Sequence, residues 1–277
     1  MWWHDVVVTG SGRAVSASRA EPFDPKTVLG PKGLRYKDRA SSLGMSAALL
    51  ALERAGLPIE RKQDSTAGGG PGMESTGVVV SSNRGNLDTV CGTAAAIRKE
   101  TVAGTSPMDL PNASPNVVAS SVAIRFGLKG PNVMLCSGTG SGLEAVRMGA
   151  VLIGSGRTNR VVVVGVEPAN GFVASLLGLD AAACFDGAAA VLLESRASAA
   201  RRGAPALARL AGSRRTTFPM RPQQDRDYAD ASGALGVLRT ADAAESIGSG
   251  AVAAALVADG PEGAVLNLAL ERDGGAR

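Results

Sequence analysis

The chain has 277 residues, of which 45% are hydrophobic and 19% are charged, and its formal net charge is +4. This composition indicates a folded globular protein and excludes an intrinsically disordered chain. The basic residues are scattered, and their densest cluster, at Arg196, Arg201 and Arg202, has no aromatic neighbours, so we interpret it as a solvated face and expect no nucleic-acid binding.

The three cysteines, Cys91, Cys136 and Cys184, show no disulfide-framework or metal-ligand spacing. We expect reduced, buried, structural thiols and no metal site, as is usual in a cytoplasmic protein. No apolar run is long enough to cross a membrane, and the first residues do not resemble a signal peptide. We therefore expect a cytoplasmic protein with no membrane contact.

The first part of the chain alternates apolar strands with amphipathic helices. We expect a strand at residues 5–9 with a Gly-rich turn after it, a helix at 38–55, and a strand at 76–82. The next helix is indicated by apolar residues at helical spacing, namely Leu87, Val90, Ala94 and Ile97.

The same alternation continues through the middle of the chain. In order, the expected elements are a turn at 111–115, a helix at 116–126, a strand at 133–136, a bend at 138–142, a helix at 143–153 and a strand at 160–165. Apolar strands alternating with helices indicate an α/β protein whose sheet is covered on both faces.

The second part of the chain is less regular. The expected elements are strands at 188–194 and 206–211, a polar linker at 214–230, a helix at 233–245, and a hairpin with strands at 251–258 and 264–271 around the sequence DGPEG. We expect an N-terminal half over residues 1–170 and a shorter C-terminal half over 171–277, packed as one compact unit.

The GSG sequence after the first strand does not complete a dinucleotide-binding motif. Val15 stands where GxGxxG requires its third glycine, and three prolines follow before residue 32 in place of a regular helix. We interpret GSG as a tight turn and expect no cofactor.

Nucleophilic catalysis needs a base, and the only histidine is His4 at the N-terminus. Ser141 does not fit the GxSxG spacing, and Cys136 precedes the bend with no acid–base partner nearby in the sequence. We expect no nucleophilic or acid–base catalysis by this chain alone.

The strand, bend and helix at 133–153 place Thr139 at a helix N-terminus, where the helix dipole and free N–H groups stabilise a thiolate or an oxyanion. Together with FGLKGP at 126–131, the opening VVVTGSG and the later FDGAAAVLLE, this segment resembles the β-ketoacyl-ACP synthases of the thiolase-fold superfamily over roughly residues 1–212. The resemblance implies a thiolase-like layered α/β fold (αβαβα) with an abbreviated C-terminal half.

Three departures from that family bear on activity. Thr139 occupies the position of the nucleophilic cysteine, the first histidine motif (HGTGT) has no counterpart, and Gly233 falls at the position of the second catalytic histidine. A thiolase-like chain of this kind resembles the chain-length factor, or ketosynthase β-subunit, of bacterial type II polyketide synthases in a truncated form.

That resemblance implies a catalytically inactive subunit that forms a heterodimer with an active ketosynthase and meets the acyl carrier protein through the complex. It would shape the acyl tunnel and control chain length, for a reduced or polyene chain. The implied tunnel residues are Asn112, Asn116, Ala119 and Ser120. The implied interface residues are those of the strand before the bend, Val133, Met134, Leu135 and Cys136.

Two alternatives remain open at this point. The chain could be an acyltransferase or hydrolase of the same fold that uses Thr139 or Ser141, with Glu144 or Glu167 as the base. It could also be a decayed paralogue that binds no partner.

Overall fold

The computed structural model describes residues 2–16, 21–59, 72–216, 231–259 and 265–274. Its strands are β1 (Val6–Val15), β2 (Thr76–Ser81), β3 (Asn132–Leu135), β4 (Arg160–Glu167), β5 (Gly187–Ser195), β6 (Ala208–Thr216), β7 (Ala253–Asp259) and β8 (Val265–Glu271). They form one sheet in the order β3-β2-β4-β5-β1-β6-β8-β7. The expected hairpin is present, because β7 and β8 pair antiparallel.

The helices are α1 (Lys26–Leu29), α2 (Arg39–Arg54), α3 (Leu87–Glu100), α4 (Val117–Phe126), α5 (Ser141–Gly154), α6 (Gly171–Leu177), α7 (Arg196–Arg201) and α8 (Ser232–Gly248). Short 3-10 turns are η1 (Trp2–Asp5), η2 (Val102–Gly104), η3 (Leu110–Ala113), η4 (Gly138–Gly140) and η5 (Ala181–Ala183). None of the described helices combines the length and the apolarity needed to cross a membrane.

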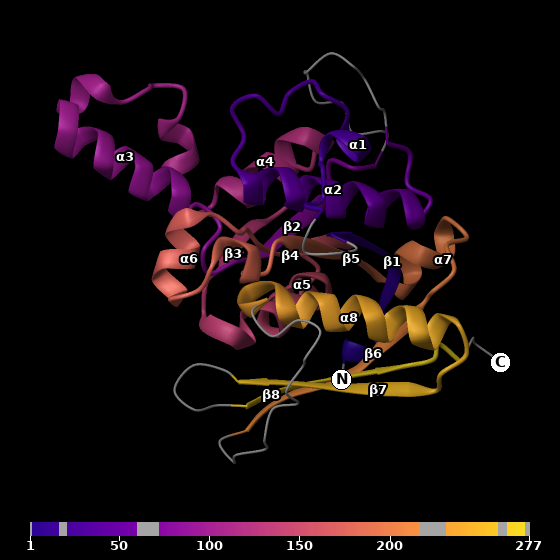
Figure 1. The fold of residues 1–277 in the computed structure, drawn as a ribbon. Coiled ribbons are helices and arrows are strands. Elements are labelled where there is room, and N and C mark those ends of the chain that lie inside the picture. Colours follow the sequence, from indigo (N-terminus) through magenta and orange to yellow (C-terminus); the bar gives the residue numbers. More distant parts are fainter. Residues whose placement is uncertain (1, 17–20, 60–71, 217–230, 260–264, 275–277) are drawn as a thin grey trace.

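The elements stack in layers (Figure 1). Helices α2 and α4 cover one face of the first five strands, and α5 and α8 cover the other face. Strands β6, β8 and β7 form a further layer on the far side of α8. The layered α/β architecture expected from the sequence is confirmed, and no described helix covers the outer face of β6, β8 and β7.

The strand pairing follows the apolar runs. Strands β2, β3 and β4 are parallel, and β5 runs antiparallel between β4 and β1. Residues 161–167 of β4 are all buried, as expected for a strand covered on both faces. Since β5 belongs to this first group of strands, the division expected at residue 170 passes through the sheet and not between two layers.

The turn expected after the first strand is wrong, because β1 continues through Gly10, Ser11 and Gly12. The two glycines instead allow α2 to approach the strand closely. A Cβ atom at Gly10 would lie 2.2 Å from the Ala51 carbonyl oxygen, and one at Gly12 would lie 2.6 Å from that of Ala47. The glycines are thus required by helix-on-strand packing.

The start of the expected polar linker is also wrong, because β6 extends to residue 216 and pairs with β8 as far as Val265. Residues 217–230 of that linker lie outside the described part of the chain. The polar residues at the end of β6 gave no strand periodicity and so predicted a linker. Pairing with β8 keeps them in a strand despite their low apolar content.

Ionic contacts fix helix α8 against β1 and α2. Glu245 accepts hydrogen bonds from Ser11 Oγ (2.7 Å) and Arg13 Nη1 (3.0 Å), and forms an ion pair with Arg54 (3.0 Å). Partial burial by itself raises the pKa of Glu245, but these hydrogen bonds and the two guanidinium charges outweigh it and hold the pKa below its ordinary value. The carboxylate form therefore anchors the helix whose N-terminus reaches the site described next.

Candidate functional site

The bend between β3 and α5 is the centre of the candidate site. Gly138 has φ +80°, a left-handed conformation that favours glycine, and the chain then enters α5 at Ser141. Gly142 packs against the N-terminal turn of α8, where a Cβ atom would lie 2.7 Å from the backbone nitrogen of Gly236. Thr139, at the tip of the bend, is exposed in this chain.

Asn83, which follows β2, joins the bend to the N-terminus of α8. Its Nδ2 donates to the Gly138 carbonyl (2.9 Å) and to Ser232 Oγ (2.8 Å), and its Oδ1 accepts from the Gly138 N–H (3.1 Å). A single carboxamide therefore contacts the neighbours of both Thr139 and Gly233. The Asn83 Oδ1 thereby occupies the backbone N–H of Gly138 in the bend.

Glu167, the last residue of β4, lies beneath Asn83 and is fully buried. Its carboxylate accepts backbone N–H groups from Asn83 (2.8 Å), Arg84 (3.0 Å) and Gly233 (2.9 Å), and the Nε of Arg84 lies 3.5 Å away. Burial raises the pKa of Glu167, and the backbone donors and the Arg84 charge partly offset that increase. Glu167 thus holds β2, β4 and α8 together at this end of the sheet.

Position 233 has no room for a side chain. A Cβ atom at Gly233 would lie 2.7 Å from Glu167 Oε1 and 3.0 Å from the Ser82 Cα. A histidine at this position would require the Ser82 backbone and the Glu167 carboxylate to move. Gly233 therefore has a close-packing role in this structure, and its assignment to the second histidine position stays a prediction.

The two candidate bases already have partners. Glu144 accepts a hydrogen bond from Ser137 Oγ (2.6 Å), and Glu167 is enclosed by the three N–H groups. Ser141 is fully buried, and its hydroxyl has no hydrogen-bond partner among the described residues. These contacts leave neither glutamate positioned as a free base.

The single histidine lies at the end of the central strands that is opposite the bend. His4 lies in η1, immediately before β1, and the start of β1 pairs with the end of β5, beside the start of β4. The bend lies at the opposite end of β4, an eight-residue strand that spans about 25 Å. The chain therefore provides no histidine near Thr139.

The four implied tunnel residues differ in their surroundings. Asn112 is buried and donates to the Tyr36 carbonyl (2.7 Å), and Ala119 is fully buried against the core around α2. Asn116 is exposed and accepts from Ser114 Oγ (2.7 Å), whereas Ser120 is half-buried. Their role in a tunnel stays a prediction.

Strand β3 lies at the edge of the sheet and pairs only with β2. Val133, Met134 and Leu135 are half-buried, and Cys136 is exposed. The expectation of a buried thiol at Cys136 is therefore wrong, because an edge strand leaves the residue after it uncovered. Cys91 is half-buried and only Cys184 is buried.

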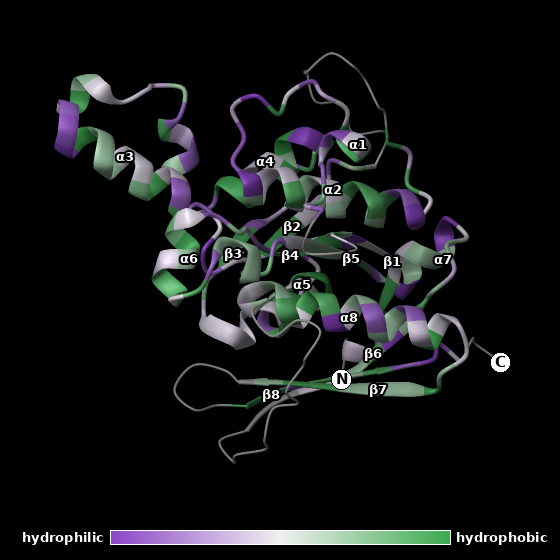
Figure 2. Ribbon diagram, viewed as in Figure 1, coloured by the Kyte–Doolittle hydropathy of each residue, from purple (hydrophilic) through white to green (hydrophobic). Residues whose placement is uncertain are grey.

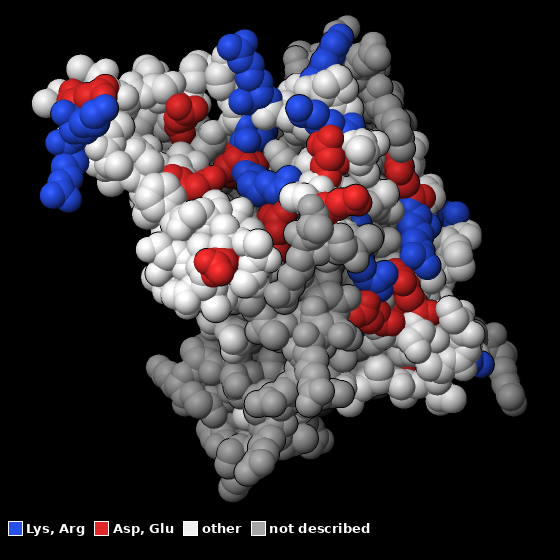
Figure 3. Space-filling view, in the orientation of Figure 1, with Lys and Arg blue, Asp and Glu red and all other residues white. Residues whose placement is uncertain are grey.

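Exposed apolar side chains surround this edge. Helix α3 extends away from the body of the protein (Figure 1), and its apolar face, predicted from helical spacing, is not buried: Val90 and Ile97 are 41% and 43% exposed. The neighbouring helix α6 exposes Phe172 and Leu176, and Leu179 is exposed just after it, on a surface that is apolar in Figure 2 and largely uncharged in Figure 3. Apolar surface of this kind marks an interaction site.

Comparison with known proteins supports the resemblance. Residues 8–182 match the family described as "Beta-ketoacyl synthase, N-terminal domain". A "3-oxoacyl-[acyl-carrier-protein] synthase 2" of Vibrio harveyi is 26% identical over 219 residues, which are 71% of this chain and 51% of that protein. One of Rhizobium meliloti (strain 1021) is 29% identical over 145 residues, 52% of this chain and 32% of that protein. The chain matches about half the length of these relatives or less.

Solved structures share the fold at low identity. "The ishigamide ketosynthase/chain length factor" superposes with a TM-score of 0.75 and 19% identity, covering 98% of this chain and 100% of that chain. A type II polyketide synthase acyl-carrier protein in complex with its ketosynthase gives 0.74 and 16%, covering 97% and 99%.

Proposed function

This chain belongs to the β-ketoacyl synthase family, and from that premise we propose that it is a catalytically inactive, ketosynthase-like subunit. It pairs with an active ketosynthase and shapes the tunnel that holds the growing acyl chain. The acyl carrier protein reaches the complex through the ketosynthase. The product is a reduced or polyene chain whose length this subunit helps to set.

One observation carries the proposal. The site keeps the bend of a ketosynthase, yet Thr139 stands at the nucleophile position and the position of the second histidine is a glycine packed against Glu167. A hydroxyl starts from too high a pKa for a helix N-terminus to ionise it, and it needs a nearby base. The chemistry must therefore come from a partner.

The exposed edge supports a partner. An edge strand with unpaired N–H and C=O groups is a ready site for strand pairing, and the helices α3 and α6 expose apolar side chains. Obligate interfaces bury on the order of 2,000 Å² or more. We accordingly expect this chain to be poorly soluble or self-associated when it is produced alone.

The alternative of an acyltransferase or hydrolase acting through Thr139 or Ser141 has less support. Ser141 is buried, and Glu144 and Glu167 are engaged elsewhere. An acyl-transfer assay on the chain alone separates the two functions, because the proposed subunit has no activity without its partner.

Thr139→Ala is expected to leave product formation by the complex within about threefold of wild type. Thr139→Cys should give no activity to the isolated chain, since no histidine lies near the bend. Turnover by the complex and intact-protein mass measurement check both variants. Acyl label on Thr139, or loss of all turnover in the alanine variant, would sink the non-catalytic assignment.

Ser120→Phe is expected to shorten the product, because a large side chain at a half-buried tunnel position removes space for the growing chain. Ala119 is a poorer test position, since it is fully buried in this chain's own core and a phenylalanine there would overpack it. Product mass measures the effect, with Ile124→Phe, 64% exposed on the same helix, as the control. Unchanged product length in the Ser120 variant would remove the tunnel assignment.

A further inference from the structure

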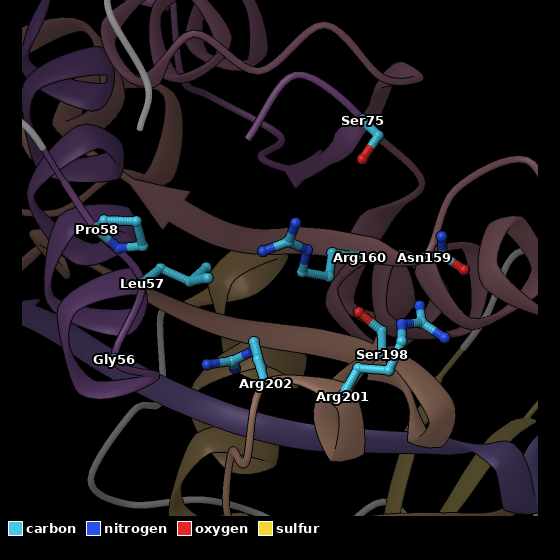
Figure 4. A pocket seen from close by; sticks show the side chains of 9 residues that line it. All are labelled: Gly56, Leu57, Pro58, Ser75, Asn159, Arg160, Ser198, Arg201 and Arg202. Carbon is cyan, nitrogen blue, oxygen red and sulfur yellow. The ribbon is translucent and has the colours of Figure 1, made fainter. Parts of the chain in front are cut away.

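A cavity of about 370 Å³ lies at the end of the central strands opposite the bend, between the start of β4 and the end of α7. Figure 4 shows three arginine side chains around it, Arg160 from β4 and Arg201 and Arg202 from the end of α7. Leu57 and Pro58 form an apolar wall on one side. The cavity shares no residue with the candidate site at the bend. Binding of a ligand there therefore does not depend on the proposed pairing with a ketosynthase.

The cavity has an excess of positive charge. Among the residues that the structure describes, its lining includes three arginines and no acidic residue. The nearest carboxylate, Glu194, is fully buried, and the Nε of Arg202 lies 3.1 and 3.0 Å from its two oxygens. The hydroxyls of Thr9 (3.0 Å) and Ser198 (3.1 Å) also donate to it. Glu194 therefore offsets the charge of Arg202 and part of the charge of Arg160, and the three arginines together keep a net positive charge.

The other two arginines differ in the donors that they keep. Arg160 lies 3.8 Å from Glu194 and donates from Nη2 to the Gly72 carbonyl (2.5 Å), and its Nε is buried, so its Nη1 is the donor left for a ligand. Arg201 is exposed. Burial lowers the pKa of Arg160, Glu194 raises it and the charge of Arg202 lowers it again, with a net decrease. An anion in the cavity would relieve this repulsion.

This arrangement revises part of the sequence interpretation. The cluster of Arg196, Arg201 and Arg202 was expected to be a solvated face, yet Arg202 is half-buried on Glu194 and Arg196 forms an ion pair with Asp273 (2.5 Å). Only Arg201 faces solvent, at the rim of a cavity.

We propose that this cavity binds a small organic phosphate. The planar fork of Arg201 matches the geometry of phosphate oxygens, and Arg160 Nη1, Ser75 and Asn159 supply further donors on the lining. The wall of Leu57 and Pro58 accommodates the organic part of the ligand. The volume falls in the range of small-molecule sites.

The test is isothermal titration of the purified full chain, alone or with the ketosynthase that co-purifies, against adenosine monophosphate, pyrophosphate and inorganic phosphate. We expect adenosine monophosphate to bind more tightly than inorganic phosphate. Arg201→Ala should weaken binding at least about tenfold. Arg201→Lys keeps the charge but loses the planar fork, so its affinity should lie between those of wild type and Arg201→Ala.

Arg98→Ala is the matched control, because it removes the same charge from the exposed surface of α3. It should leave binding unchanged. No binding of any of the three probes up to about 10 mM, or equal weakening by the Arg98 and Arg201 variants, would overturn the proposal. Equal affinity for adenosine monophosphate and inorganic phosphate would overturn the assignment of an organic ligand.

Discussion

Glu167→Ala is expected to lower the free energy of unfolding by about 3–5 kcal/mol. The substitution leaves three backbone N–H groups, from Asn83, Arg84 and Gly233, without this acceptor, and removes the carboxylate that lies 3.5 Å from the buried Arg84 guanidinium. Each buried donor left unsatisfied costs about 1–3 kcal/mol. Denaturant unfolding measures the loss.

Glu167→Gln should cost less, because the amide oxygen still accepts hydrogen bonds. Glu74→Ala is the control, since Glu74 pairs only with exposed Lys129, and we expect its unfolding midpoint to match wild type. If Glu167→Ala unfolds at the wild-type midpoint, Glu167 does not hold β2, β4 and α8 together.

Met134→Pro is expected to abolish co-purification with the ketosynthase while the chain stays folded. The carbonyls of Pro131 and Leu135 accept from Val78 and Ser82 of the β2 side. Because strand residues alternate, the N–H of Met134 points away from β2, toward a partner strand. Proline removes that N–H and is tolerated in an edge strand.

Val133→Pro gives the matched contrast, because the N–H of Val133 points toward β2 and its loss should destabilise the chain itself. Sizing chromatography of the co-expressed proteins and thermal unfolding of each variant separate the two effects. Retention of the complex by Met134→Pro at wild-type yield would show that β3 is not the pairing strand.

The sequence was sufficient to predict the strand, bend and helix around Thr139, and the hairpin of β7 and β8, because both follow local apolar patterns and turn residues. These features depend on short stretches of sequence, so the apolar periodicity and the family resemblance are enough to predict them.

Features that depend on distant contacts could not be predicted. Gly10 and Gly12 are fixed by the backbone of α2, and the role of Asn83 arises only when β2, the bend and α8 meet. Glu167 was considered as a base, but the three amides that enclose it come from two distant segments. The one sequence signal for Asn83 was a polar cluster directly after a buried strand.

The apolar spacing of α3 predicted a helix correctly, but it could not tell what covers the apolar face. Val90 and Ile97 face outward in the single chain, since periodicity reports an apolar face and not what covers it. A partner surface produces the same pattern as a protein core.

Reconstitution tests the central claim most directly. A candidate partner ketosynthase is purified alone and with this chain, and chain extension is measured with acyl carrier protein and malonyl units, together with acyl label on each subunit. The account predicts a stable complex, extension only when both proteins are present, and label on the ketosynthase alone. A well-behaved monomer that ignores every ketosynthase, or acyl label on this chain, would contradict it.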